Sequence, residues 1–145
     1  MQFLTLETLK RKIGKLWLRR EYAIESDLIC RYTKVVDDDN PRWQGVGAEV
    51  PPVMLPALSF GSVASTLRVL GTLILHGASD LEIYLPVRDG DDVTVTTAVA
   101  SLRVRKLRSG ISAFITFTQN YSNQRGEKIA SCTQLTVLRL DGSDG

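Results

Sequence analysis

The last third of the chain carries the pattern that decides the fold. Residues 93–140 read VTVTTAVASLRVRKLRSGISAFITFTQNYSNQRGEKIASCTQLTVLRL. Apolar side chains recur at every second position, first from Val93 to Val99 and then from Ile111 to Phe117. Turn-forming residues separate these runs at Ser109-Gly110 and at Asn123–Gly126. Period-two alternation between tight turns predicts three long antiparallel strands joined as a meander.

The pattern also predicts how this meander bends and how it begins. Apolar residues after Ser101 have the opposite parity to those before Ala98, which predicts a β-bulge between these positions. A preceding strand is expected to begin at Asp80 and to end at Pro86. The Asp89-Gly90 pair then turns the chain into the meander.

The first half of the chain predicts helices. Residues 57–70 are apolar and nearly free of charge, which predicts a helix buried on most sides. Ser26 and Asp27 offer N-cap oxygens to a second helix, which stops at the run from Asp37 to Pro41. A short helix is expected within residues 2–16 and a strand over 17–23. A helix followed by a curved antiparallel sheet predicts one α+β domain formed by all 145 residues, with the sheet wrapped around the helix.

The composition excludes several classes of protein. Among 145 residues, 43% are hydrophobic and 23% are charged, and the formal net charge is +2. These values are typical of a globular domain and argue against a nucleic-acid or membrane partner. Basic residues from Lys10 onward argue against a signal peptide. Cys30 and Cys132 follow no disulfide pattern, so we expect reduced thiols in a cytoplasmic protein.

A single histidine restricts the chemistry further. His76 is the only imidazole of the chain, so a metal site with several histidines cannot be built. No metal or organic cofactor is expected.

Three segments resemble a known family. Residues 31–43 contain the run Asp38-Asp39-Asn40-Pro41, which is similar to the hydratase signature of the MaoC-like dehydratases, Gly-Asp-x-Asn-Pro-aliphatic-His after a helix with a tyrosine. Residues 75–91, LHGASDLEIYLPVRDGD, are similar to the Leu-His-Gly-Gly and Arg-Pro-x-Arg-x-Gly-Asp segments of N-terminal-type members. Residues 121–127, YSNQRGE, are close to the hairpin Tyr-x-Asn-Gln-x-Gly-Glu. Their order and spacing make the resemblance specific.

The resemblance implies a fold and an activity. The fold is the hot dog, in agreement with the wrapped helix predicted above. The activity is the reversible hydration of a trans-2-enoyl thioester to a 3-hydroxyacyl thioester, carried on coenzyme A or on acyl carrier protein. Such proteins act as homodimers or as heterodimers in which one subunit supplies the catalytic pair. In active members the aspartate and histidine of the signature share the acid–base work.

Carried over residue by residue, the signature is incomplete. Its glycine falls on Asp37, its aspartate on Asp38, and its Asn-Pro pair on Asn40 and Pro41. Its histidine falls on Trp43. An indole only donates a hydrogen bond and cannot accept a proton at nitrogen, so the standard catalytic pair is absent. Trp43 is expected to pack into the vacated site or to cover the tunnel mouth.

Several functions remain open at this point. In the first, the chain is a non-catalytic subunit that pairs with an active hot-dog dehydratase. In the second, it is a catalytic subunit that uses Asp38 with a helper such as His76. In the third, it only binds acyl thioesters. A hot-dog thioesterase is a further alternative, since these enzymes use a carboxylate on the same fold. Without the resemblance, the Asp37–Asp39 run is a solvated helix end and His76 a structural residue at a strand start.

The remaining site residues follow from the expected ligand. Asn40, Pro41 and Trp43 are expected beside the substrate. The acyl chain is expected to pass between the central helix and the partner, along Pro52, Val53, Leu58 and Phe60. A basic set at a strand end, formed by Arg103, Arg105, Lys106 and Arg108, is expected to contact the phosphates of coenzyme A or an acidic carrier protein, because arginine binds phosphate in a bidentate way. Otherwise it is a solvated strand tip.

Overall fold

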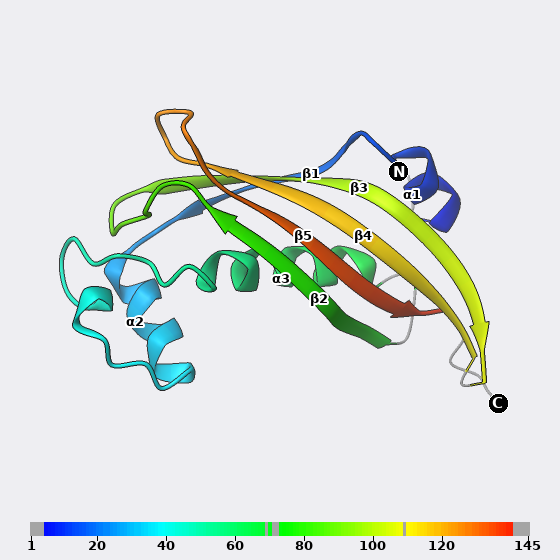
Figure 1. The fold of residues 1–145 in the computed structure, drawn as a ribbon, viewed down its shortest axis with the longest axis horizontal. Helices are drawn as coiled ribbons and strands as arrows, with labels where there is room; N and C mark the ends of the chain where they lie inside the picture. The colour runs from blue at the N-terminus through cyan, green and yellow to red at the C-terminus, as the bar shows by residue number, and fades with distance from the viewer. Residues whose placement is uncertain (1–4, 69, 71–72, 109, 141–145) are drawn as a thin grey trace.

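The fold is a curved five-stranded antiparallel sheet wrapped around one long helix (Figure 1). The computed structural model describes residues 5–68, 70, 73–108 and 110–140. The strands lie in the order β1-β3-β4-β5-β2. Their bounds are β1 Leu16–Ala23, β2 Leu73–Ile83, β3 Asp92–Leu107, β4 Gly110–Ser122 and β5 Lys128–Arg139. The helices are α1 Leu6–Arg11, α2 Ser26–Val35, the short η1 Pro41–Trp43, and α3 Met54–Leu67, which lies against the concave face.

The meander predicted from the period-two pattern is confirmed. Strands β3, β4 and β5 pair as antiparallel neighbours, and the register of β3 shifts between Val99 and Ser101, where the bulge was predicted. Side chains such as Val99, Ile115 and Phe117 are fully buried on the concave face. The strand and helix predicted before Ser26 are present as β1 and α1. The predicted turn residue Ser109 lies outside the described residues.

The central helix differs from its prediction. It begins at Met54, three residues before the predicted start, and it ends at Leu67. Pro56 falls in the first turn, where a missing backbone N–H breaks no helical hydrogen bond. Most of its residues are buried or half-buried, as expected, but Ala57, Gly61 and Ser65 form an exposed stripe on the face that points away from the sheet. Because the helix is largely apolar on all sides, its composition did not distinguish the exposed face from the buried face.

The predicted start of the strand before the meander is also wrong. β2 begins at Leu73, seven residues before Asp80, and it ends at Ile83. His76 therefore lies within the strand and not at its start. Gly77 sits in a register shift of β2, where an added Cβ would lie 3.1 Å from Leu135. The strand is nearly all exposed because it forms one edge of the sheet.

The core divides into two apolar clusters, one at each end of α3. The first joins α2, the start of α3 and the β2–β3 connection, and includes Ile29, Met54 and Val87. The second joins α1, the end of α3 and the β3–β4 hairpin, and includes Leu9 and Leu67. Within the described residues, no helix is long and apolar enough to cross a membrane.

Candidate functional site

The loop after α2 has the backbone geometry that its sequence motif requires. Asp37 is the one described non-glycine residue with a positive φ, +56°. Its N–H donates to the carbonyl of Lys34, and the N–H of Asp38 donates to the carbonyl of Thr33 at 2.8 Å. This pair of bonds is a Schellman motif, which places a left-handed residue just after a helix. The family signature that the sequence resembles has glycine here, so the positive φ agrees with the alignment of the two.

The carboxylate of Asp38 is held by donors from its own loop. Its Oδ2 accepts a hydrogen bond from Trp43 Nε1 at 3.0 Å, and its Oδ1 accepts from the Asn40 N–H at 3.1 Å. Asn40 in turn caps η1, because its Oδ1 accepts from the Arg42 N–H at 3.0 Å, and Pro41 begins that helix. The side chain of Asp38 is exposed. The loop therefore presents a carboxylate whose nearest partner donates a hydrogen bond but cannot accept a proton.

Trp43 lies between two pockets. On one side, a pocket of about 480 Å³ is lined by Asp38 and the end of α2; we call it the α2-side pocket. On the other side, a pocket of about 270 Å³ is lined by Pro52, Leu55 and residues 83–87; we call it the α3-side pocket. Trp43 is half-buried against the first apolar cluster. Both volumes are near the lower end of the range for ligand pockets.

The three motif segments converge at this end of the sheet. Residues 85–87 line the α3-side pocket beside Trp43. Asp89 follows directly, and its carboxylate accepts from the N–H groups of Ser26, at 2.8 Å, and Gly47, at 3.1 Å. In the third segment, Gln124 donates to Asp91 at 2.9 Å. Segments that are far apart in the sequence thus form one local structure.

Asp89 corrects the predicted start of α2. Ser26 and Asp27 were expected to cap this helix, but Glu25 occupies the N-cap position and makes no capping bond. The first N–H of the helix is satisfied by Asp89, from the turn before β3. This residue ties α2 to the sheet and so positions the loop that carries Asp38. This role of Asp89 was not predicted from the sequence; the only sequence signal for it was its position in the second motif segment.

The residues expected along the acyl chain lie in different surroundings. Pro52 lines the α3-side pocket, and Val53 is 62% exposed at the start of α3. Leu58 is half-buried and packs against the first apolar cluster. Phe60 makes an edge-to-face contact with His76, with ring centroids 5.4 Å apart. These side chains follow α3 from the pocket toward β2.

His76 and Asp38 do not share a pocket. His76 Nε2 hydrogen-bonds to Ser79 Oγ on the same strand, and its ring packs against Phe60. It is not among the described residues that line the α2-side pocket. Within one chain, the structure therefore does not bring these two groups together.

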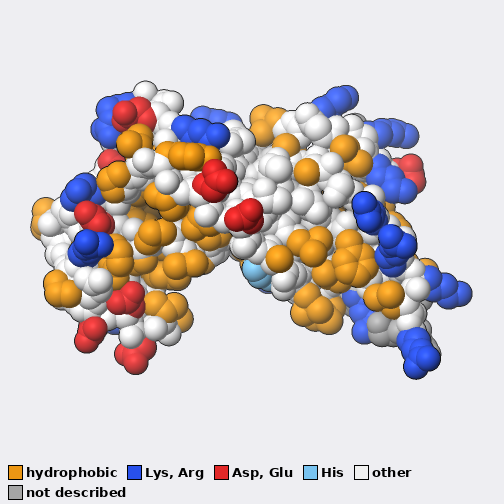
Figure 2. Space-filling view, viewed as in Figure 1, with side chains coloured by type: hydrophobic (Ala, Val, Ile, Leu, Met, Phe, Trp, Pro, Cys, Tyr) orange, Lys and Arg blue, Asp and Glu red, His pale blue; other side chains and the backbone are white. Residues whose placement is uncertain are grey.

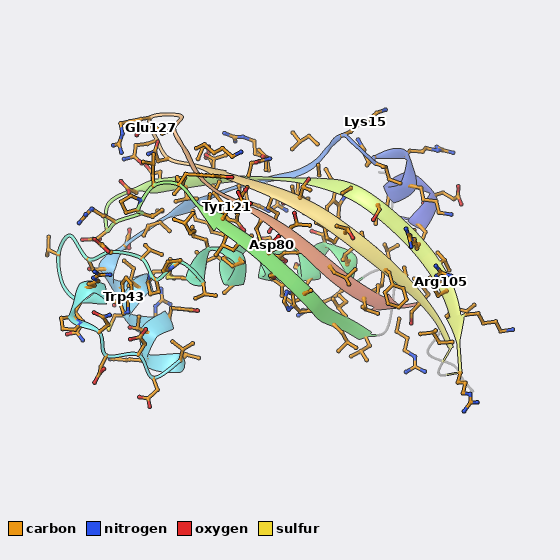
Figure 3. The ribbon with its side chains drawn as sticks, in the orientation of Figure 1. Lys15, Trp43, Asp80, Arg105, Tyr121 and Glu127 are labelled. Carbon is orange, nitrogen blue, oxygen red and sulfur yellow. The ribbon has the colours of Figure 1, made fainter. Side chains whose placement is uncertain are left out.

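The basic set lies at the opposite end of the molecule. Figure 3 shows Arg105 at the far end of β3 from Trp43. Arg103 and Arg105 line a surface groove of about 370 Å³ on the outer face of the sheet, together with Phe114. Lys106 and Arg108 are exposed beside them. The two predicted halves of the site are thus separated by the length of the sheet.

A buried polar layer, which the sequence analysis missed, separates the two apolar clusters. Gln119 Oε1 accepts from Tyr121 Oη at 3.1 Å and from Gln134 Nε2 at 2.8 Å, and Ser59 Oγ of α3 lies 3.0 Å from it. Burial raises the pKa of Tyr121, whose hydroxyl therefore stays protonated. Gln134 Oε1 and Thr136 Oγ1 have no hydrogen-bond partner among the described residues.

Other titratable groups play a structural part. Hydrogen bonds from Arg125 and Asn123 lower the pKa of Glu127, and burial raises the pKa of the Cys132 thiol. Both cysteines are free thiols. In the part of the chain that the structure describes, no group of three or more His, Cys, Asp or Glu side chains is arranged to hold a metal ion.

Comparison with known proteins identifies the fold. A family model described as "FAS1-like, dehydratase domain region" matches residues 12–132. The chain is similar in structure to the (R)-hydratase from A. caviae involved in PHA biosynthesis, with 20% identity, a TM-score of 0.69, and coverage of 86% of this chain and 93% of that one. No curated protein matches the sequence.

Two further solved structures have the same fold. The MaoC-like dehydratase from Rhodospirillum rubrum is 22% identical, with a TM-score of 0.64 and coverage of 95% of this chain and 98% of that one. The HadBC (3R-hydroxyacyl-ACP dehydratase) complex from Mycobacterium tuberculosis is 14% identical, with a TM-score of 0.66 and coverage of 84% and 92%. The predicted hot-dog fold and the resemblance to MaoC-like dehydratases are confirmed.

Proposed function

Because the chain belongs to the family of the FAS1-like dehydratase domain region, we propose that it binds acyl thioesters as the non-catalytic subunit of a hot-dog hydratase or dehydratase. The thioester is carried on coenzyme A or on acyl carrier protein, and the reaction on the active subunit is hydration of an enoyl group or its reverse. We place the protein in the cytoplasm, in keeping with its two free thiols.

One observation carries this proposal. Trp43 stands where the signature has histidine, and its indole N–H donates to Asp38 Oδ2 at 3.0 Å. Hydration needs one group that takes a proton and another that delivers it. Asp38 has a partner in the right place, but that partner has no lone pair with which to accept a proton. The loop thus has the aspartate of the signature but not the histidine that would complete an acid–base pair.

The alternatives have less support. His76 would have to act as the helper of Asp38, yet it packs against Phe60 and bonds Ser79 on β2. No contact of the described residues favours a thioesterase over a hydratase.

Pairing with a second subunit is expected along β2. This strand is one edge of the sheet, and its apolar residues Leu73 and Leu75 are 46% and 51% exposed. The other edge, β1, carries Arg19, Arg20 and Glu21, and charges of this kind protect an edge from pairing. Exposed small residues of α3 extend the unpaired surface beside β2. We propose that a copy of this chain, or an active hot-dog subunit, covers this surface; the structurally similar HadBC protein is itself a complex.

The test is to restore the missing imidazole. The wild-type chain alone should not hydrate crotonyl-CoA, measured as loss of the ultraviolet band of the conjugated thioester. Trp43→His should produce hydratase activity, because Asp38 and the loop are already in place. Adding Asp38→Asn to this variant should abolish the activity again.

Matched variants separate the alternatives. Trp43→Phe removes the indole without supplying a base and should stay inactive. Hydration by the wild-type chain that Asp38→Asn abolishes would mean that the chain is itself a catalyst and would overturn the non-catalytic role. Release of free thiol from crotonyl-CoA would instead identify a thioesterase.

A further inference from the structure

Positive charge is concentrated at one end of the molecule. Ten of the 18 Lys and Arg residues belong to α1 and the segment after it, the end of α3, and the β3–β4–β5 end of the sheet. We call this surface the basic end; its residues are Lys10, Arg11, Lys12, Lys15, Arg68, Arg103, Arg105, Lys106, Arg108 and Arg139. The elements that carry them meet in the second apolar cluster, through Leu9, Leu67 and Leu138. They therefore lie together at one end of the molecule, on both faces of the sheet, although their sequence positions are far apart.

These charges are not neutralised within the described part of the chain. Among the segments that form the basic end, Glu7 is the only described acidic residue. The four ion pairs of the described residues all use basic side chains from elsewhere: Arg19, Arg31, Arg88 and Arg125. Figure 2 shows Lys and Arg side chains gathered at this end, whereas Asp and Glu gather toward the centre and the other end. The net charge of the whole chain is only +2, so it does not reveal that basic and acidic side chains gather in different parts of the molecule.

The size of the surface indicates the kind of ligand. Coenzyme A carries three phosphate groups close together, which one cluster of basic residues could hold. The basic end instead spreads over several elements, and the groove lined by Arg103 and Arg105 has a single described aromatic side chain, Phe114. Nucleic-acid surfaces usually interleave several aromatic side chains with the basic ones. An extended, uncompensated basic surface fits an acidic protein surface best, because charge complementarity steers such encounters.

We propose that the basic end is the docking surface for an acidic acyl carrier protein. The inference rests on the proposed function and extends it, because it chooses the carrier over free coenzyme A and assigns basic residues of α1, of the segments directly after α1 and α3, and of the sheet to the interaction. A subunit that lacks its own acid–base pair thereby gains a definite role, which is to bring the carrier to the assembly.

The position of the basic end suits this role. β2 runs from the basic end, at Leu73, to the α3-side pocket, which Ile83 lines. A two-fold axis perpendicular to the sheet pairs two such edges antiparallel and keeps both α3 helices on one side. The basic end of one subunit then lies beside the pocket of the other. A carrier docked on this chain would face the site of the paired subunit.

The test compares two forms of the same acyl group. Binding of crotonyl-loaded bacterial acyl carrier protein and of crotonyl-CoA is measured by calorimetry for the full chain and for Arg103→Glu/Arg105→Glu. The double variant should lose at least tenfold in affinity for the carrier and less than twofold for crotonyl-CoA. Affinity for the carrier should also fall as salt is raised, and less steeply for the variant. The control Arg19→Glu/Arg20→Glu makes the same charge change on β1 and should alter neither affinity by more than twofold.

The outcomes separate this inference from the proposed function. Unchanged carrier binding by the Arg103/Arg105 variant, or an equal loss for crotonyl-CoA, would overturn the docking surface. Equally tight binding of a single-stranded oligonucleotide would identify a nucleic-acid surface instead and would also overturn it. A further result would contradict only the proposed function. If the carrier protein binds equally tightly with and without its crotonyl group, and crotonyl-CoA does not bind, the chain does not recognise acyl thioesters, but the basic end is still a docking surface for the carrier. Circular dichroism of both double variants checks that they are folded.

Discussion

The Asp38 loop and the buried polar layer are both networks of hydrogen bonds, yet they are built in opposite ways. The loop joins Asp38 to Asn40 and Trp43, all within six residues, and it is exposed to water. The layer joins Ser59 to Gln119, across 60 residues of sequence, and Gln119 to Gln134, across 15, and it is buried. Because the loop is a local structure, we expect substitutions in it to have little effect on the stability of the protein. Substitutions in the layer should lower the stability of the whole chain.

The strongest test of this comparison is Gln119→Leu. The change removes the acceptor shared by Tyr121 and Gln134. Tyr121 Oη keeps its hydrogen bond to Ser59 Oγ, but Gln134 Nε2 is left as a buried donor without a partner among the described residues, which costs about 1–3 kcal/mol. We expect the free energy of unfolding in urea to fall by about 3 kcal/mol. Asn120→Leu, on the exposed face of the same strand, should change it by less than about 0.5 kcal/mol. Equal effects of the two variants would mean that the layer contributes nothing specific.

Asp37→Gly is expected to have the next largest effect, and in the opposite direction. The positive φ of Asp37 is unfavourable for a side chain with a Cβ and free for glycine. The variant should therefore raise the unfolding free energy by about 1 kcal/mol. Asp37→Ala removes the side chain but keeps the Cβ, so it should not stabilise. Stabilisation by alanine as well would point to charge repulsion among the aspartates as the cause.

Asp38→Ala tests whether the loop is independent of the core. It removes the acceptor of the Trp43 N–H and of the Asn40 N–H, but water reaches both donors. We expect a loss of less than about 1 kcal/mol in thermal unfolding, well below the effect of Gln119→Leu. A loss as large as that of Gln119→Leu would contradict the description of the loop as a local structure.

The smallest expected effect concerns a second local loop, at residues 123–127. Arg125 Nε donates to Glu127 at 2.7 Å, and this bond and one from Asn123 lower the pKa of the carboxyl group. A lowered folded pKa gives a contribution that is present above the ordinary Glu pKa of about 4.3 and is lost as the pH falls through the folded value. Glu127→Gln should therefore lower the melting temperature slightly at pH 7, and the difference from wild type should vanish in acid. A difference that persists in acid would rule out ionisation as the cause.

Local structure was the part that could be predicted from sequence. The bulge after Val99 and the end of α2 near Asp37 were both predicted, because parity and turn-forming residues act over a few positions. The start of β2 was missed, since an edge strand with an exposed face has no clear alternation. The capping of α2 by Asp89 was missed because its two partners are 63 residues apart. It could not be predicted either that His76 lies away from Asp38, because the position of His76 depends on how the strands pair.

The sequence by itself determined the meander, the wrapped helix and the replacement of histidine by Trp43, because period-two alternation and residue identity can be read from neighbouring positions. Only the tertiary structure decided that Gln119, Gln134 and Ser59 form one buried layer, and that ten basic residues from the ends of α1, α3 and the sheet gather at one end of the molecule. These groups meet because strand register and helix packing bring distant segments together. Hydrogen bonds and charge act over a few ångströms of space, whatever the separation in sequence.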